Sequence, residues 1–395
     1  MSEPPREHDV AVASTTVHVR EWGPIDGPPL LFWHGLGSYT GLYVAEVAEA
    51  LGRDHGLRVI AIDPPGVGRS PALPAEAYRP PELARLAAGL LEAMAIERCV
   101  FMGHSWGGLV GCHLAAEQPA LVAALVLLDG GYEDSDVTGP GSGRALDDEV
   151  AAARGQQRSF DSWDALGEFL REHFPDLTPT AEAAWRAGHV ERDGRVVDTM
   201  SPETVGAAAH GVRHAPAAAT HAAIAASGLR VLLLVGGRGL DDVRRAALRR
   251  FSASLPAADV RVLADSSGDL VADLGPRLAR LVGDWLSGGW YDRISAEGML
   301  DVLAPYQPVV VGAHPLGLAA ADTPVEVVCR ATDLPAFART VERAFGRRHG
   351  FALHGGSLDG EEAVFAEFDV SGLPVQLSAQ AEHVHRRLGA ATLGL

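Results

Sequence analysis

The stretch "GHSWGG", residues 103–108, decides the interpretation of this chain. It follows the apolar run "CVFM" and opens a helical segment, "GLVGCHLAAEQ". Gly103 and Gly107 flank Ser105 at the spacing of a nucleophile elbow, a sharp turn from a strand into a helix. Such a turn strains the backbone of the serine, and side chains two residues away on either side would clash. The motif therefore predicts a strand, a turn and a helix, with Ser105 presented as a nucleophile.

Short apolar runs alternate with helical patterns on both sides of this motif. Most of the runs are continuously hydrophobic, which is typical of strands buried on both faces of a parallel sheet. They are "PLLFWHG" (29–35), "LRVIAID" (57–63), "CVFMGHS" (99–105), "VAALVLLD" (122–129), "LRVLLLVGG" (229–237) and "DVRVLAD" (259–265). Helical segments lie between them, such as residues 81–96 and 241–255. The alternation predicts an α/β fold with a mostly parallel sheet covered by helices, and "VASTTVHVREWG" predicts an antiparallel edge strand or hairpin.

Two loops at predicted strand ends support a reaction site. "LFWHGLGS" (31–38) leaves its strand through His34 and Gly35. The backbone N–H groups of Leu36 and Trp106 are then expected to form a two-donor oxyanion hole, aided by the helix dipole. A second loop, "DPPGVGRS" (63–70), is rich in glycine and also follows a strand.

Taken in order, "HGLGS", "DPPGVGRS" and "GHSWGG" resemble the α/β-hydrolase family over residues 11–290. The resemblance implies an eight-stranded sheet, a cap inserted after the sixth strand and Ser105 as the nucleophile. It also implies an acid after strand six or seven and a histidine after strand eight. The interval between Asp129 and Leu229 lacks strands of the buried type, so we expect a helical cap at about 132–226 within a domain of residues 1–290.

Two aspartates compete for the role of the acid. Asp129 ends the strand in "LVLLDGG", whereas Asp241 follows the next strand in "LVGGRGLDD". Gly239 occupies the position at which the family usually carries an acid after strand seven. We prefer Asp129, and Asp241 remains the alternative.

The histidine is where the chain departs from the family. "DSSGDLVADLGP" aligns with the family's histidine loop if Gly268 occupies the histidine position. A serine hydroxyl is a poor nucleophile without a positioned base. His104 adjoins the serine, but we expect its side chain to point elsewhere. The substitutes left open are His34 in the oxyanion loop, His210, His214 and His221 in the cap, and the carboxylates Asp265 and Asp269.

A second pattern begins beyond "SGGW" (287–290), which marks a boundary between residues 1–290 and a small α+β domain, 291–395. "VVVGAHPLGLAAADTPVEVVCRATDLPAF" resembles, over residues of about 292–390, a small family of uncharacterised domains built like a nucleotidyltransferase palm. Such domains carry Ser-Asp-apolar-Asp on a strand, so that two carboxylates on one face can hold Mg²⁺. Here Pro324 replaces the first carboxylate and Glu326 remains, with Glu367 and Asp369 on a later strand. We therefore predict a catalytically degenerate domain without a metal site.

Composition limits the remaining possibilities. The 395 residues are 47% hydrophobic and 21% charged, which is typical of globular domains, and the net charge of −18 argues against nucleic acid or an anionic membrane as partner. No run approaches the roughly 20 apolar residues of a membrane helix, and the polar start lacks a signal-peptide core, so we expect a cytoplasmic protein. The three cysteines lack ligand spacing, and we expect neither a metal nor a cofactor.

These observations predict a serine hydrolase that acts on an ester, amide or similar acyl bond of a small, apolar molecule held beneath the cap. The first alternative is a pseudoenzyme that binds a small ligand or serves as a scaffold. The second is Mg²⁺-dependent nucleotidyl transfer by the C-terminal domain. The sequence leaves the substrate and the oligomeric state open.

Overall fold

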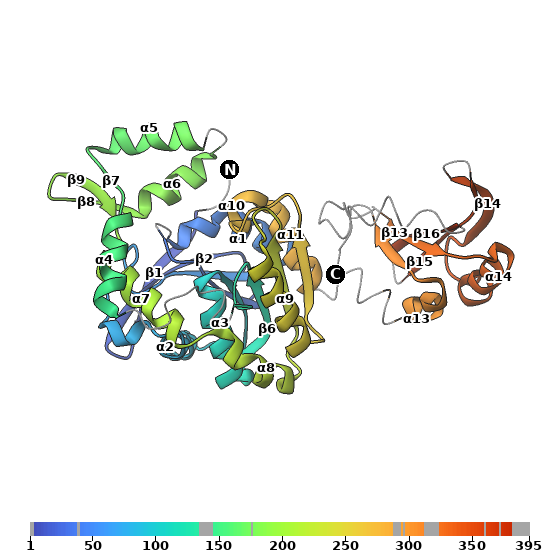
Figure 1. Ribbon diagram of the computed structural model, residues 1–395, viewed down its shortest axis with the longest axis horizontal. Coiled ribbons are helices and arrows are strands. Elements are labelled where there is room, and N and C mark those ends of the chain that lie inside the picture. The colour runs from blue at the N-terminus through green and yellow to red at the C-terminus, as the bar shows by residue number, and fades with distance from the viewer. Residues whose placement is uncertain are drawn as a thin grey trace. The chain divides into compact units, whose positions relative to one another are not determined.

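The chain divides into two compact units, Met1–Ala279 and Arg280–Leu395. The computed structural model describes residues 4–37, 40–133, 145–174, 177–286, 294, 297–311, 324–358, 361–370 and 373–380. Each unit has its own sheet and its own hydrophobic core, and Figure 1 shows the elements of both.

The first unit is built on an eight-stranded sheet of order β1-β2-β4-β3-β5-β6-β10-β11. Its strands are β1 (Arg6–Val12), β2 (Thr15–Trp22), β3 (Pro29–Trp33), β4 (Arg58–Asp63), β5 (Cys99–His104), β6 (Val122–Leu128), β10 (Val231–Gly236) and β11 (Asp259–Leu263). The first two strands form an antiparallel hairpin at the edge, β2 pairs antiparallel with β4, and the remaining neighbours are parallel. This confirms the predicted mostly parallel sheet.

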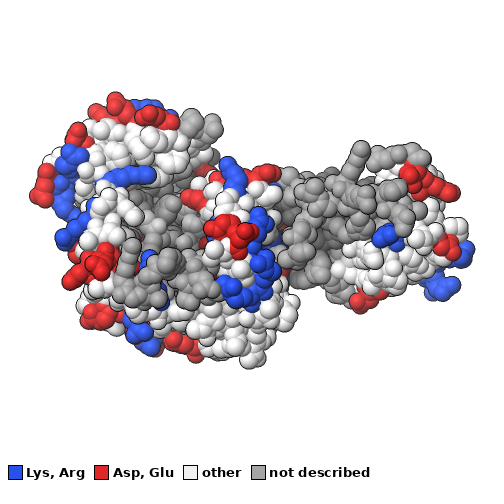
Figure 2. Space-filling view, in the orientation of Figure 1, with Lys and Arg blue, Asp and Glu red and all other residues white. Residues whose placement is uncertain are grey.

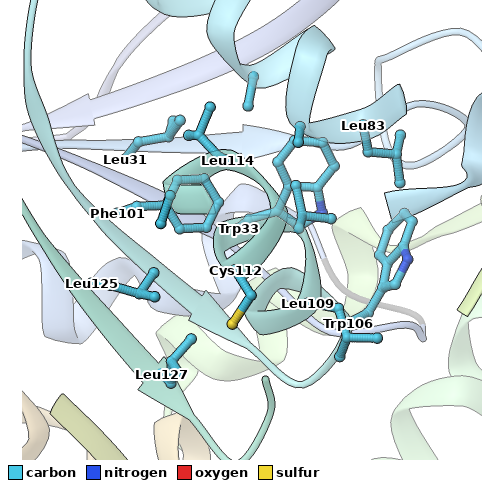
Figure 3. Packing of buried hydrophobic residues seen from close by; sticks show 14 of the residues in the cluster. Leu31, Trp33, Leu83, Phe101, Trp106, Leu109, Cys112, Leu114, Leu125 and Leu127 are labelled. Atoms are coloured by element: carbon cyan, nitrogen blue, oxygen red, sulfur yellow. The ribbon is translucent and has the colours of Figure 1, made fainter. Parts of the chain in front are cut away.

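Helices cover the sheet and bury its apolar strands (Figure 1). They are α1 (Ala45–His55), α2 (Pro80–Ala93), α3 (Trp106–Glu117), α8 (His221–Ser227), α9 (Asp242–Ser254) and α10 (Leu270–Leu274), with short 3₁₀ turns η1 (Gly41–Val44), η2 (Ala75–Tyr78), η3 (Pro119–Leu121) and η4 (Ala217–Thr220). The boundary between the two units falls within α11 (Pro276–Leu286). α3 is buried over almost its whole length, which explains why its sequence is small and apolar rather than amphipathic. In the core, Trp33 and Trp106 pack edge to face with ring centroids 5.9 Å apart (Figure 3).

The segment between β6 and β10 is the one that the sequence predicts to form a cap. It contains α4 (Leu146–Gln156), β7 (Ser159–Phe160), α5 (Trp163–His173), α6 (Pro179–Ala187), β8 (His189–Arg192), β9 (Arg195–Asp198) and α7 (Pro202–His214). The sequence predicted only helical pieces here, yet β7, β9 and β8 form a small antiparallel sheet. Asp193 and Gly194 both have positive φ (52° and 75°), so they close β8 and β9 as a two-residue hairpin. That Asp-Gly pair was the signal for the hairpin.

The second unit is a separate mixed sheet of order β12-β13-β16-β15-β14. Its elements are α13 (Met299–Leu303), η5 (Ala304–Tyr306), β12 (Val309–Val311), β13 (Val325–Arg330), α14 (Leu334–Phe345), β14 (Ala352–Leu358), β15 (Glu361–Val370) and β16 (Leu373–Gln380). α14 begins where Asp333 accepts a hydrogen bond from the N–H of Ala336, and it buries Phe337, Val341 and Phe345 at a helical spacing of four residues. Strand β14 was not predicted, because its exposed, glycine-containing sequence lacks an apolar run.

No helix among the described residues has the length and apolar character needed to cross a membrane. On the face of the first unit shown in Figure 2, acidic and basic side chains are interspersed.

Candidate active site

Ser105 stands in the strained turn that the motif predicts. It lies between β5 and α3 with φ 48° and ψ −112°, a conformation that costs a non-glycine residue about 1–3 kcal/mol. Its N–H donates to the carbonyl of Leu128, which ties the elbow to the end of β6. A Cβ atom at Gly103 would lie 2.3 Å from the carbonyl oxygen of Gly107, and one at Gly107 would lie 2.1 Å from that of Trp33. Both glycines are therefore required by close backbone packing.

We expect Gly107→Ala to destabilise the protein by about 2 kcal/mol, because backbone atoms must shift to admit the methyl group. Gly155 in α4 is the matched control: nothing lies within 4 Å of a Cβ there, so Gly155→Ala is expected to stabilise by up to about 1 kcal/mol. Urea unfolding of both variants measures the difference. Equal effects of the two substitutions would contradict the close packing at the elbow.

The predicted oxyanion loop passes directly against the elbow. A Cβ atom at Gly35 would lie 3.2 Å from Cβ of Ser105, so only a residue without a side chain fits there easily. Trp106 is the first residue of α3, and its N–H is among the helix donors that lack an intrahelical acceptor. Leu36 follows Gly35 in the loop. The loop and the helix start therefore meet at Ser105, as an oxyanion hole requires.

His34 is placed as a structural residue of this loop. It is fully buried, and its Nδ1 donates to the carbonyl of Gly35 over 2.7 Å. Burial lowers the pKa of His34 to about 4. A ring that binds protons so weakly is poorly matched to a serine hydroxyl, and we do not assign it the role of base.

Asp129 lies beside the elbow at the end of β6. A Cβ atom at the next residue, Gly130, would lie 2.3 Å from the carbonyl oxygen of Ser105. Arg244 Nη2 donates to Asp129 Oδ1 over 2.5 Å, and the Tyr132 hydroxyl donates to the same oxygen over 3.4 Å. Burial raises the pKa of Asp129, and the charge of Arg244 acts in the opposite direction. Arg244 and Tyr132 were not predicted, since nothing in the sequence distinguishes Arg244 from the other arginines of α9.

Asp241, the alternative acid, is occupied elsewhere. It is exposed and caps the N-terminus of α9, where its Oδ1 accepts a hydrogen bond from the N–H of Arg244 over 2.8 Å. This is an ordinary helix-capping role. Asp129 therefore remains the candidate for the acid of the site.

Gly268 lies in the loop after β11 and faces Asp129. The loop crosses closely over the end of β10, where a Cβ atom at Gly236 would lie 1.9 Å from the carbonyl oxygen of Ser267. A Cβ atom at Gly268 would lie 2.3 Å from Asp129 Oδ2. A side chain at position 268 would thus point toward Asp129. The Oδ2 atom of Asp129 lies so close that it would clash with the Cβ atom of that side chain.

The side chain of His104 contacts this same loop. Its Nε2 lies 3.1 Å from the carbonyl oxygen of Gly268, and the ring is only 6% exposed. The ring of Tyr43, from η1, stacks on it with centroids 5.9 Å apart, and the Tyr43 hydroxyl donates to Asp269. Sequence reasoning missed Tyr43, because η1 reaches the loop only through the tertiary fold.

The other proposed bases have structural contacts. His221 Nε2 donates to the carbonyl of Gly131 over 2.8 Å, and the ring packs edge to face on Phe251. His210 and His214 stack on one another in α7 with centroids 4.2 Å apart. Asp269 caps α10 by accepting from the N–H of Ala272. We assign none of these residues the role of base.

A buried ion pair fixes the loops around the site. Asp63 is fully buried at the end of β4, and Arg20 Nη1 donates to its Oδ1 over 2.6 Å. The same oxygen accepts from the N–H of Gly41, and Oδ2 accepts from the N–H of Arg69. One carboxylate therefore anchors both η1 and the loop "DPPGVGRS".

Residues 28–205 match the family described as alpha/beta hydrolase fold. "Putative carbamate hydrolase RutD" of Variovorax paradoxus (strain S110) is 41% identical over 113 residues, which is 29% of this chain and 42% of that protein. The chain thus spans less than half the length of the curated relatives it matches. The crystal structure of E-2-(acetamidomethylene)succinate hydrolase matches with a TM-score of 0.60 and 21% identity, over 72% of this chain and 99% of that one.

A thioesterase domain from the curacin biosynthetic pathway matches with a TM-score of 0.57 and 20% identity, over 71% of this chain and 99% of that one. Together with the family match, these structures confirm the α/β-hydrolase fold expected from the three loop motifs.

The second unit was expected to resemble a nucleotidyltransferase palm. Residues 292–393 match a domain of unknown function, DUF4269, and this match gives no support to that resemblance. Glu326 of β13 pairs with Gln376 of β16, which in turn pairs with Glu367 of β15, so the two carboxylates are separated by a strand. Within the described ranges, no group of three or more His, Cys, Asp or Glu side chains is arranged to hold a metal ion.

Proposed function

We propose that the α/β-hydrolase unit hydrolyses an ester, amide or similar acyl bond of a small, apolar molecule, with Ser105 as the nucleophile. The observation that carries the proposal is the strained backbone of Ser105 between two close-packed glycines. A serine kept at positive φ offers no structural gain, whereas the elbow exposes its Oγ and aims the start of α3 at a developing oxyanion. The similarity to the putative carbamate hydrolase RutD and to the matched hydrolase and thioesterase structures supports this reaction class.

The substrate would lie at the carboxyl ends of the parallel strands, under the cap. Ser105 directly follows β5, its N–H donates to the last residue of β6, and the loop after β3 packs against it at Gly35. Open α/β sheets bind their ligands at this edge. The N–H groups of Leu36 and Trp106 would hold the carbonyl oxygen as it gains negative charge.

Labelling with a fluorophosphonate probe tests the proposal. We expect one covalent adduct, located at Ser105 by peptide mass spectrometry, and no adduct on Ser105→Ala. Ser254→Ala, an exposed serine at the end of α9, is expected to label like the wild type. A folded wild-type protein that remains unlabelled would overturn the proposed activity.

The second candidate is a non-catalytic protein that binds a small ligand at the same edge. The observation that favours it is Gly268, where the family's histidine is missing and Asp129 fills the place of its first side-chain atom. This candidate predicts saturable binding of p-nitrophenyl esters, measured by competition or thermal shift, without release of p-nitrophenol.

For the second unit we propose that phosphoryl transfer does not take place, since Pro324 stands where the first carboxylate is expected. Titration of the full-length chain with ATP in the presence and absence of Mg²⁺ is expected to show no Mg²⁺-dependent heat. Binding that requires Mg²⁺ and is lost in Glu326→Gln would contradict this and support the nucleotidyltransferase alternative.

A further inference from the structure

We propose that His104, the residue before the nucleophile, is the base that takes the proton of Ser105. This inference rests on the proposed hydrolase function and names the group that replaces the missing histidine. It rests on the position of the ring, on the identity of its hydrogen-bond partner and on the surrounding charges.

The partner of Nε2 determines which nitrogen can accept a proton. A backbone carbonyl only accepts hydrogen bonds, so the contact of 3.1 Å to Gly268 places the proton of the neutral ring on Nε2. Nδ1 then carries the lone pair. His104 is therefore oriented in the tautomer that a base requires.

Nδ1 and Ser105 are neighbours across the oxyanion loop. The point at which Gly35 would carry a Cβ atom lies 3.2 Å from His104 Nδ1 and 3.2 Å from Cβ of Ser105. Gly35 therefore packs against both groups, and its lack of a side chain lets the ring and the serine lie close to the same short segment of the loop. A substrate carbonyl held by Leu36 and Trp106 would approach the same region.

The surroundings hold the ring in place and offer partners to its protonated form. Tyr43 stacks on one side of the ring, and the carbonyl of Gly268 fixes its edge. The contact to that carbonyl strengthens when the ring is protonated, because hydrogen bonds to an ionised donor are stronger than neutral ones. His104 and Asp129 also attract each other electrostatically when both are charged. Asp129 can thus stabilise the imidazolium through its charge.

The reaction balances with these groups alone and water. Ser105 Oγ forms a bond to the acyl carbon while its proton passes to His104 Nδ1, and the carbonyl π electrons move to the oxygen held by Leu36 and Trp106. When the intermediate collapses, the bond to the leaving group breaks, and the leaving alcohol or amine takes the proton from Nδ1. Water then attacks the acyl-enzyme in the same way, which releases the acid and restores Ser105.

His104→Gln tests the proposal, because its amide nitrogen can still donate to Gly268 but cannot take a proton. His113→Gln is the matched control: His113 is also a buried histidine, with Nε2 3.2 Å from the carbonyl oxygen of Ala215. We expect His104→Gln to slow both fluorophosphonate labelling and p-nitrophenyl acetate turnover by about 100-fold or more. We expect His113→Gln to keep the wild-type rate.

His104→Ala with added imidazole separates a base from a structural residue. Imidazole is expected to restore part of the labelling rate of this variant, whereas a merely structural role would not respond to it. A folded His104→Gln that is labelled at the wild-type rate overturns the role of His104 and leaves the proposed function intact. A wild type that is not labelled at all overturns both.

Discussion

We expect Gly268→His to raise ester hydrolysis by about 100-fold, the lower end of what a positioned general base contributes. The reason is geometric. A side chain at position 268 projects at Asp129 Oδ2, so the new imidazole would gain an acid partner that orients it. In the wild type the Nε2 of His104 contacts a backbone carbonyl instead of a carboxylate, and a carboxylate partner is expected to make the new imidazole the stronger base. Initial rates with p-nitrophenyl acetate measure it.

The same substitution is expected to lower stability by about 1–3 kcal/mol. The new Cβ atom would lie 2.3 Å from Asp129 Oδ2, so the carboxylate must rotate away. Arg244 and Tyr132 oppose this rotation, because both bind its other oxygen. Urea unfolding shows the loss as a lower midpoint at an unchanged slope.

Gly268→Ala is the matched control for both effects. It adds the same Cβ atom without the imidazole, so it should lose stability and gain no activity. A folded Gly268→His with no gain over Gly268→Ala would mean that position 268 does not face the nucleophile, or that the site is disabled elsewhere.

The sequence predicted the parts of this site that depend on local backbone constraints. "GHSWGG" predicted a strand, a strained serine and a helix, all of which are present, and the register of the loop after β11 predicts Gly268 at the family's histidine position. The sheet followed from continuous apolar runs, which only a doubly covered parallel sheet can bury. These inferences rest on local sequence patterns and do not depend on tertiary contacts between distant segments.

The partners of Asp129 and His104 could not be predicted in this way. Arg244 and Tyr43 reach the site from α9 and η1, and their sequence neighbourhoods resemble ordinary helix surfaces. The contact of His104 with the carbonyl of Gly268 was not predicted, because it joins residues that are 164 positions apart in the chain. The hairpin of β8 and β9 was missed for a local reason, since its Asp-Gly turn was present in the sequence.

Asp63→Asn is expected to destabilise the protein by about 3–5 kcal/mol, the cost of breaking a buried ion pair by removing one charge. Every partner of this carboxylate is a donor: Arg20 and the N–H of Gly41 at one oxygen, and the N–H of Arg69 at the other. An asparagine amide nitrogen would face a donor in either orientation. Urea unfolding followed by tryptophan fluorescence measures the loss.

Asp54→Asn is the control that isolates burial as the cause. Arg53 and Asp54 form an ion pair of 2.7 Å, similar in length to that of Arg20 and Asp63, but their side chains are 67% and 44% exposed. Exposed pairs contribute about 0–1 kcal/mol, so this variant should unfold close to the wild type. Because Asp63 also holds Gly41 at the start of η1, its loss should loosen Tyr43 against His104 and slow the labelling of Ser105. An Asp63→Asn variant as stable as Asp54→Asn would show that the buried pair does not anchor these loops.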